Sequence, residues 1–147
     1  MSAILGKKHV QEYVYDFAVD GGTDDTFIDL SAKAGAAVLP QGAIVENVTL
    51  RVLTAVEGSS STMIVGNTTD PNGYMEAIAE ASLVAGAVIR VGEQAGALMW
   101  DDTNDHAISF LVDSANDADF GVTIGTADLT VGKVVFMVEY YAPKTEA

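Results

Sequence analysis

The sequence of 147 residues contains no cysteine and only two histidines, and these absences exclude several kinds of site. Without cysteine the chain has no disulfide, no zinc–thiolate centre and no thiol nucleophile. His9 and His106 stand apart in the sequence, and no G-x-S-x-G segment supplies a serine nucleophile. We therefore predict that the protein is not an enzyme, with no catalytic residue and no cofactor.

Basic residues are also scarce, with 7 lysines and arginines against 21 aspartates and glutamates and a net charge of −14. Nucleic acids and anionic membranes are bound through cationic side chains, so this composition argues against both partners. No apolar run reaches the roughly 18 residues of a membrane-spanning helix. The first residues lack the apolar core of a secretory signal, so we expect synthesis in a cytoplasm.

Acidic residues gather in segments rich in turn-forming residues, notably 101–105 and 113–119. Two interpretations stay open. Aspartate favours such turns because its side chain accepts hydrogen bonds from its own backbone. Alternatively, the two turns meet and form a weak calcium site, since Ca²⁺ takes about six to eight oxygen ligands. The segment after Asp101 lacks the glycine and glutamate of an EF-hand loop, and we predict no metal site.

Proline is rare, whereas apolar and β-branched residues recur at every second position, which is typical of β-strands. The pattern predicts about eight short strands separated by turn signals, within residues 13–19, 26–30, 43–58, 61–67, 88–100, 106–112, 120–126 and 127–143. This spacing favours an all-β fold, an antiparallel β-sandwich resembling a jelly roll. We expect an N-terminal arm at 1–12, the β-sandwich domain at 13–143 and a C-terminal tail at 144–147.

Two segments carry further expectations. A single strand over 43–58 would be unusually long, so we expect a bulge or bend near Glu46 or Thr54. Residues 74–83 contain helix-favouring residues and predict one short helix, or else a loop that packs Met75 and Ile78 inward.

The last strand is apolar on both faces. One face carries Val134, Phe136, Val138 and Tyr140. The other carries Lys133, Val135, Met137, Glu139 and Tyr141. A strand at the rim of a small monomer would usually show water a polar face. We therefore expect Val135, Met137 and Tyr141 to form a self-association face.

Lys7, Lys8 and His9 lie in the expected arm, and the two lysines are its basic pair. The segment is either a frayed terminus or an arm that contacts an acidic neighbour. For Trp100, Tyr140 and Tyr141 two interpretations stay open, a platform that binds a sugar or, as is more common for aromatic residues of β-sandwiches, part of a core or an interface.

Four stretches occur in an order that resembles the phage auxiliary capsid proteins, also called head decoration or cement proteins. They are YVYDFAVDGGTDDTFIDL (13–30), LPQGAIVENVTLRVLTAV (39–56), SSSTMIVGN (59–67) and ADLTVGKVVFMVEYYAP (127–143). The resemblance implies a β-sandwich or jelly-roll module, commonly trimeric, bound to the outside of a phage head. It implies no catalytic residue.

From this resemblance we expect a non-enzymatic virion protein that decorates and stabilises a phage capsid. Its expected partners are the major capsid protein and two further copies of itself, and its expected place is the outer surface of the head, after synthesis in the host cytoplasm. Lys7, Lys8 and His9 would contact the capsid. The alternatives are a tail, neck or head-fibre component with an adhesive or glycan-binding role, and a small β-sandwich hydrolase or metal-dependent module.

Overall fold

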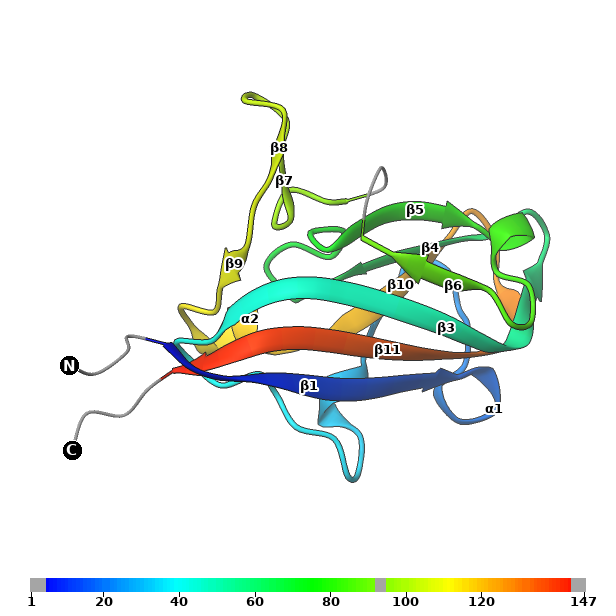
Figure 1. Cartoon of the computed structure of the whole chain (residues 1–147). Helices are drawn as coiled ribbons and strands as arrows, with labels where there is room; N and C mark the ends of the chain where they lie inside the picture. Colours follow the sequence, from blue (N-terminus) through cyan, green and yellow to red (C-terminus); the bar gives the residue numbers. More distant parts are fainter. Residues whose placement is uncertain (1–4, 92–94, 144–147) are drawn as a thin grey trace.

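The computed structural model describes residues 5–91 and 95–143, and two antiparallel β-sheets stacked face to face make up most of it (Figure 1). The first sheet has the order β1-β11-β3-β6, with strands β1 (Leu5–Asp16), β11 (Leu129–Pro143), β3 (Ile44–Gly58) and β6 (Val88–Arg90). The second has the order β2-β10-β4-β5, with strands β2 (Phe27–Asp29), β10 (Gly121–Gly125), β4 (Thr62–Gly66) and β5 (Met75–Ala79).

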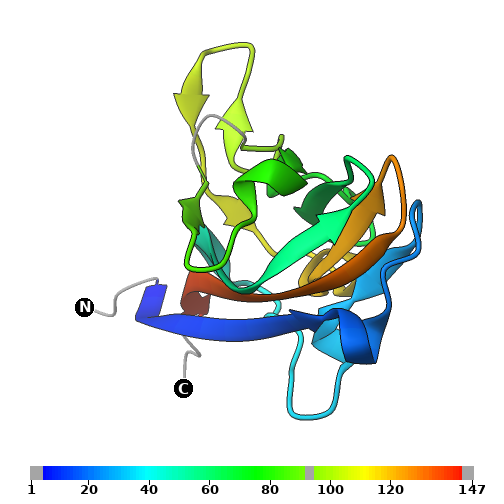
Figure 2. The same ribbon diagram turned by 90° about the vertical axis from the view of Figure 1, so that its right-hand side faces the viewer.

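Smaller elements surround the two sheets. Strand β9 (Phe110–Leu111) pairs with the start of β3, and β7 (Trp100–Asp101) pairs with β8 (His106–Ala107). The β7–β8 hairpin projects away from the sandwich in both views (Figures 1 and 2). The helices α1 (Phe17–Asp20) and α2 (Ala115–Ala118) are single turns. No helix in the described ranges is long and apolar enough to cross a bilayer.

The eight strands of the two main sheets pair as nested antiparallel hairpins. Strand β1 pairs with β11, β2 with β10, β3 with β6, and β4 with β5. Along the chain these strands alternate between the sheets, except for β4 and β5, which form the innermost hairpin. This is the jelly-roll arrangement of strands, and it confirms the predicted all-β sandwich.

The core lies between the sheets and is filled by alternate residues of each strand. Tyr13 of β1 stacks on Phe120 with ring centroids 4.7 Å apart, and Phe120 also meets Phe136 of β11 edge-on. All three side chains are almost fully buried. The period of two in the sequence therefore separates core residues from outward residues, as expected for strands with one face on a core.

Strand β3 contains the irregularities predicted for it. Its register against β11 shifts near Glu46, where Asn47 and Val45 pair with consecutive residues of β11. A second shift leaves Leu53 unpaired, beside Thr54. Both positions confirm the expected bulges, which let a strand of 15 residues bend around the core.

The predicted helix at 74–83 is largely wrong. Met75–Ala79 forms β5, and only Glu80–Ser82 makes a 3-10 turn. Met75 and Ile78 are buried, as the alternative of an inward-packing segment predicted. Apolar residues three apart suit a helix, but β5 has a register shift against β4, which brings both side chains to the core face.

Residues 5–12 of the expected arm belong to β1 and pair with β11, from Leu5 opposite Pro143 to Glu12 opposite Met137. The strand therefore begins eight residues before the predicted domain boundary at residue 13. Polar side chains dominate this part of the strand because it lies at the edge of the sheet. Residues 1–4 of the arm and the tail at 144–147 lie outside the described residues.

Candidate interaction surface

We call the outward side of the β1-β11-β3-β6 sheet the outer face. Figure 1 looks onto it, and no described segment crosses in front of β1, β11 or β3. Because alternate side chains of β11 point to opposite sides, the core takes Val134, Phe136 and Val138, and the outer face takes Val135, Met137 and Tyr141. The structure thus brings the three predicted self-association residues together on one uncovered surface.

Apolar side chains of the neighbouring strands extend this surface. Val14 of β1 pairs with Val135, and Glu12 pairs with Met137. Three of the most exposed large apolar residues of the described chain also belong to this sheet: Val10 (61%), Leu53 (41%) and Val88 (61%). On the other side of β11, Arg51 and Thr49 of β3 lie opposite Val135 and Met137, so the apolar strip follows β1 and β11 and is bordered by polar residues of β3. Apolar side chains that gather on one exposed face mark an interaction surface.

Charged side chains flank the apolar strip at the end where β1 begins. Lys8 Nζ lies 3.1 Å from a carboxylate oxygen of Glu139 and 3.6 Å from one of Glu46. The hydrogen bond to Glu139 is the main cause that raises the pKa of Lys8 above its ordinary value. Lys8, Glu46 and Glu139 line a pocket of about 290 Å³ together with Arg90.

The other residues of the predicted capsid-contacting segment lie nearby. Lys7 is exposed and forms no ion pair within the described residues. His9 is exposed and stacks on Tyr140, with ring centroids 5.5 Å apart and an interplanar angle of 17°. Lys7, Lys8 and His9 are therefore held on a strand, which fixes their positions far better than a free arm would.

The alternative of an aromatic platform for a sugar is not met by the adjacent rings of β11. Tyr140 is buried on the core side of the strand, whereas Tyr141 lies on the outer face. Trp100 belongs to β7, at the base of the projecting hairpin. The two tyrosines cannot present one flat surface to a sugar, because consecutive residues of a strand point in opposite directions.

Aspartates in the acidic turns accept hydrogen bonds from nearby backbone groups. Asp101 Oδ1 accepts from the amides of Thr103 and Asn104 at 3.0 and 3.1 Å. Hydrogen bonds from Asn104 hold the pKa of Asp101 below its ordinary value. Asp119 likewise accepts from the backbone N–H and the hydroxyl of Thr68. Across residues 5–91 and 95–143, no group of three or more His, Asp or Glu side chains is arranged to hold a metal ion.

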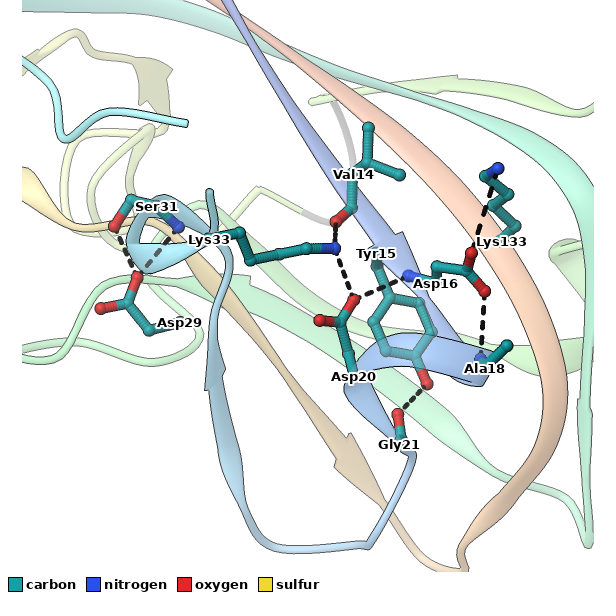
Figure 3. A network of polar contacts seen from close by, with 10 residues as sticks. All are labelled: Val14, Tyr15, Asp16, Ala18, Asp20, Gly21, Asp29, Ser31, Lys33 and Lys133. Atoms are coloured by element: carbon teal, nitrogen blue, oxygen red, sulfur yellow. Dashed lines mark hydrogen bonds and ion pairs between the residues drawn. The ribbon is translucent and has the colours of Figure 1, made fainter. Parts of the chain in front are cut away.

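One functional feature was missed by sequence reasoning, namely a lysine that reaches the edge of β1 from a distant loop. Lys33 Nζ lies 2.6 Å from the carbonyl oxygen of Val14 and 2.8 Å from Asp20 Oδ2, as Figure 3 shows. Asp20 also accepts from the amide of Asp16 at 2.9 Å. The sequence contains no local signal for this contact, because 19 residues separate Lys33 from Val14.

Comparison with known proteins establishes the fold. No protein-family model matches the chain, and no curated protein matches it. Among solved structures, a chain of the cyanophage Pam1 capsid asymmetric unit is similar, with a TM-score of 0.61 and 19% identity over 97% of this chain and 90% of that one. A chain of the Ralstonia phage GP4 capsid is similar with a TM-score of 0.58 and 16% identity, over 99% and 90%. The chain therefore shares the all-β fold of chains found in two phage capsids.

Proposed function

We propose that the protein is a non-enzymatic structural component of a phage virion, which binds the outer surface of the head and reinforces the shell. The observation that carries the proposal is the similarity of nearly the whole chain to chains in two phage capsid structures. The order of four stretches in the sequence, which resembles that of decoration proteins, supports the same class independently of the fold.

The surface of the protein supports an assembling role. The outer face places Val135, Met137 and Tyr141 where a second copy can cover them. In the proposed assembly, three copies surround a three-fold axis, since a closed ring lets each copy bury the same surface without leaving a free one. The net charge of −14 keeps the assembled particles dispersed and needs no compensation by nucleic acid, because the genome lies inside the shell.

The proposed contact with the major capsid protein involves the start of β1. Lys7 is the exposed cation there that has no ion pair within the described residues, whereas Lys8 is already paired with Glu139 and Glu46. An acidic surface on the capsid would complement Lys7, and His9 beside it offers a ring for packing. Complementary charges of this kind raise the rate and specificity of docking more than its affinity.

The test compares binding of purified protein to phage heads that lack it. Lys7→Glu should weaken binding about 5- to 50-fold, equivalent to about 1–2 kcal/mol, because it replaces attraction with repulsion. Lys133→Glu is the control, since it changes the net charge equally on a partly exposed lysine near the opposite end of the sheet, 4.0 Å from Asp16. Co-sedimentation and electron microscopy of the particles report the outcome.

Equal loss in both variants would refute the contact at Lys7 but retain the virion role. If the wild-type protein neither binds heads nor occurs in purified virions, the proposed function is wrong. Deleting residues 1–12 is a poor test, because it removes residues 5–12 of β1, which pair with β11, and so disturbs the sheet as well as the contact.

A further inference from the structure

Strand β1 lies at the edge of its sheet, with β11 on one side and no strand of the described chain on the other. An edge strand carries a row of backbone N–H and C=O groups that neighbouring strands have not paired. A further strand can bind only those residues of β1 that direct these groups outward.

The direction of the backbone groups in β1 follows from the hydrogen bonds at the opposite edge of the sheet, on the β6 side of β3. The backbone of Val52 bonds to Ala87 and Gly86, and the carbonyl of Val48 accepts from Val91, so these groups of β3 face the β6 side. Because successive residues of a strand direct their backbone groups to opposite sides, the residues between them, Thr49 and Arg51, face β11.

The same alternation continues through β11 to β1. Thr49 and Arg51 are opposite Met137 and Val135, so those two residues of β11 face β3, and the residues between them face β1. Their partners in β1 include Tyr13 and Gln11. The residues of β1 that remain, Lys8, Val10 and Glu12, therefore direct their N–H and C=O groups away from the sheet.

Two contacts of β1 confirm this direction independently. The carbonyl of Val14 accepts from Lys33 Nζ at 2.6 Å, and the amide of Asp16 donates to Asp20 Oδ2 at 2.9 Å. Figure 3 shows both groups satisfied by side chains from outside the sheet. Val10, Glu12, Val14 and Asp16 follow one another at every second position of β1. Their backbone N–H and C=O groups therefore lie along the same edge of the strand.

The unpaired part of the edge is short and has clear limits. At one end, a register shift against β11 interrupts the strand between Leu5 and Lys8. At the other end, Lys33 occupies the carbonyl of Val14, and the segment 30–36 lies beside the strand. Within the described residues, the one side-chain hydrogen bond to the backbone of the run 8–12 is donated by Gln11 Nε2 to the carbonyl oxygen of Glu12, at 3.3 Å.

The charge pattern of this run is complementary to itself. When a second copy of the run lies antiparallel to the first, centred on Val10, Lys8 of each copy stands opposite Glu12 of the other. Opposite charges directly across two strands stabilise the pairing, whereas a shift by two residues places other side chains opposite each charge. A centre at His9 or Gln11 would leave only two opposing pairs of outward-directed residues within the limits set by Lys33 and the register shift.

We propose that the β1 edge pairs with the β1 edge of a second copy about a two-fold axis through Val10. Lys8, Val10 and Glu12 then form about six backbone hydrogen bonds, two for each of three opposing pairs. The first sheets of the two copies become one continuous sheet across the axis. The Lys8–Glu12 pairs select the register between the two β1 strands, and the backbone hydrogen bonds supply the affinity.

This pairing does not rest on the proposed function. A ring of three copies that covers the outer face leaves the edge of β1 free. The backbone groups of this edge point along the plane of the sheet, whereas the side chains of the outer face point perpendicular to it. On a shell, the same contact would join a copy in one trimer to a copy in the next across a two-fold axis. A two-fold contact uses the same patch on both copies, which suits a run that is complementary to itself.

Val10→Cys tests the pairing, because the chain has no other cysteine. In a hydrogen-bonded antiparallel pair the two Cα atoms lie about 5.5 Å apart, which a disulfide can bridge. Mild oxidation of the isolated protein should therefore give a disulfide-linked dimer. Val88→Cys is the matched control, because Val88 has the same exposed fraction, 61%, and lies on the opposite edge strand β6.

We expect Val10→Cys to cross-link at least tenfold faster than Val88→Cys at the same protein concentration. Adding Glu12→Lys to Val10→Cys should slow the reaction by opposing Lys8 with lysine, and adding Lys8→Glu as well should restore it. Equal rates for the two single cysteine variants would overturn the proposal. Failure of the double charge reversal to restore the rate would overturn the register centred on Val10. Because the assay uses no phage particles, its failure is distinguishable from failure of the virion role.

Discussion

Lys33 connects the 3-10 turn after β2 (Leu30–Ala32) to the edge of β1. Its ammonium group bonds to the Val14 carbonyl and to Asp20, whose side chain is only 8% exposed. A carboxylate with so little access to water needs its partners, because water cannot replace them. The amide of Asp16 supplies the other partner, so three segments meet at this carboxylate.

Lys33→Met should lower the free energy of unfolding by about 1–3 kcal/mol, since hydrogen bonds to charged groups contribute amounts of this size. Methionine keeps most of the apolar stem, so the loss reports the ammonium group. Lys133→Met is the control, because Lys133 is 43% exposed and lies 4.0 Å from Asp16. It should cost less than about 1 kcal/mol. Urea denaturation of both variants measures the difference, and equal losses would contradict the importance of Lys33.

Among the elements, the strands with one strongly apolar face were predictable from the sequence. Alternation identified 43–58 and the final strand, and both lie where predicted. The first part of β1 was not identified, because Lys7, Lys8 and His9 show no apolar face. Pairing with β11 holds that segment extended despite its polarity, and the residues that supply this pairing lie more than 120 positions away in the sequence.

The same reasoning separates the two parts of the candidate surface. Val135, Met137 and Tyr141 could be placed together because alternation within one strand is a local property. The free edge at Lys8, Val10 and Glu12 could not, because an edge exists only once the order of strands is known. Strand order depends on contacts between distant segments, which single-chain patterns do not encode.

The β7–β8 hairpin gives a prediction for an element rather than for the whole fold. Asp101→Ala removes the acceptor for the amides of Thr103 and Asn104, so both amides should lose protection against hydrogen exchange. The rest of the molecule should stay protected, because the hairpin projects from the sandwich. Exchange measured by NMR or mass spectrometry tests this, with Asp102→Ala as the control in the same turn. A global loss of protection would show that the hairpin is part of the core folding unit.

Acid should act on the same hairpin. The pKa of Asp101 is lower in the folded protein than its ordinary value of 3.8 in an unfolded chain. Its ionised form therefore stabilises the hairpin fully at every pH above that ordinary value. This stabilisation is lost as the pH falls through the lowered pKa and the carboxylate takes a proton. The Asn104 side-chain amide should then show a shift in its NMR signal that is absent in Asp101→Ala.

At the scale of the whole molecule, the outer face should control assembly. We expect the wild-type protein to elute with a mass of three times 15.3 kDa by light scattering. Met137→Asp should remain folded, because Met137 is outside the core, but should shift the mass to that of one chain. An unpaired charge in an apolar interface costs about 3–5 kcal/mol. Val19→Asp is the control, since Val19 is 72% exposed and belongs to α1, beyond the end of β1. A trimer that persists with Met137→Asp would exclude this face from the interface.

The nesting of the hairpins affects how the protein folds during its synthesis. Strand β11 lies between β1 and β3, so the middle of the first sheet is absent until the last strand has left the ribosome. Contacts between such distant segments make folding slow, since the chain must first close its longest loops. Until β11 is made, β1 and β3 each have an unpaired edge. Neighbouring chains that are translated from the same messenger RNA have the same unpaired edges. The order of translation therefore places the greatest risk of mispairing on β1, the first strand made and the last to be joined to its neighbour.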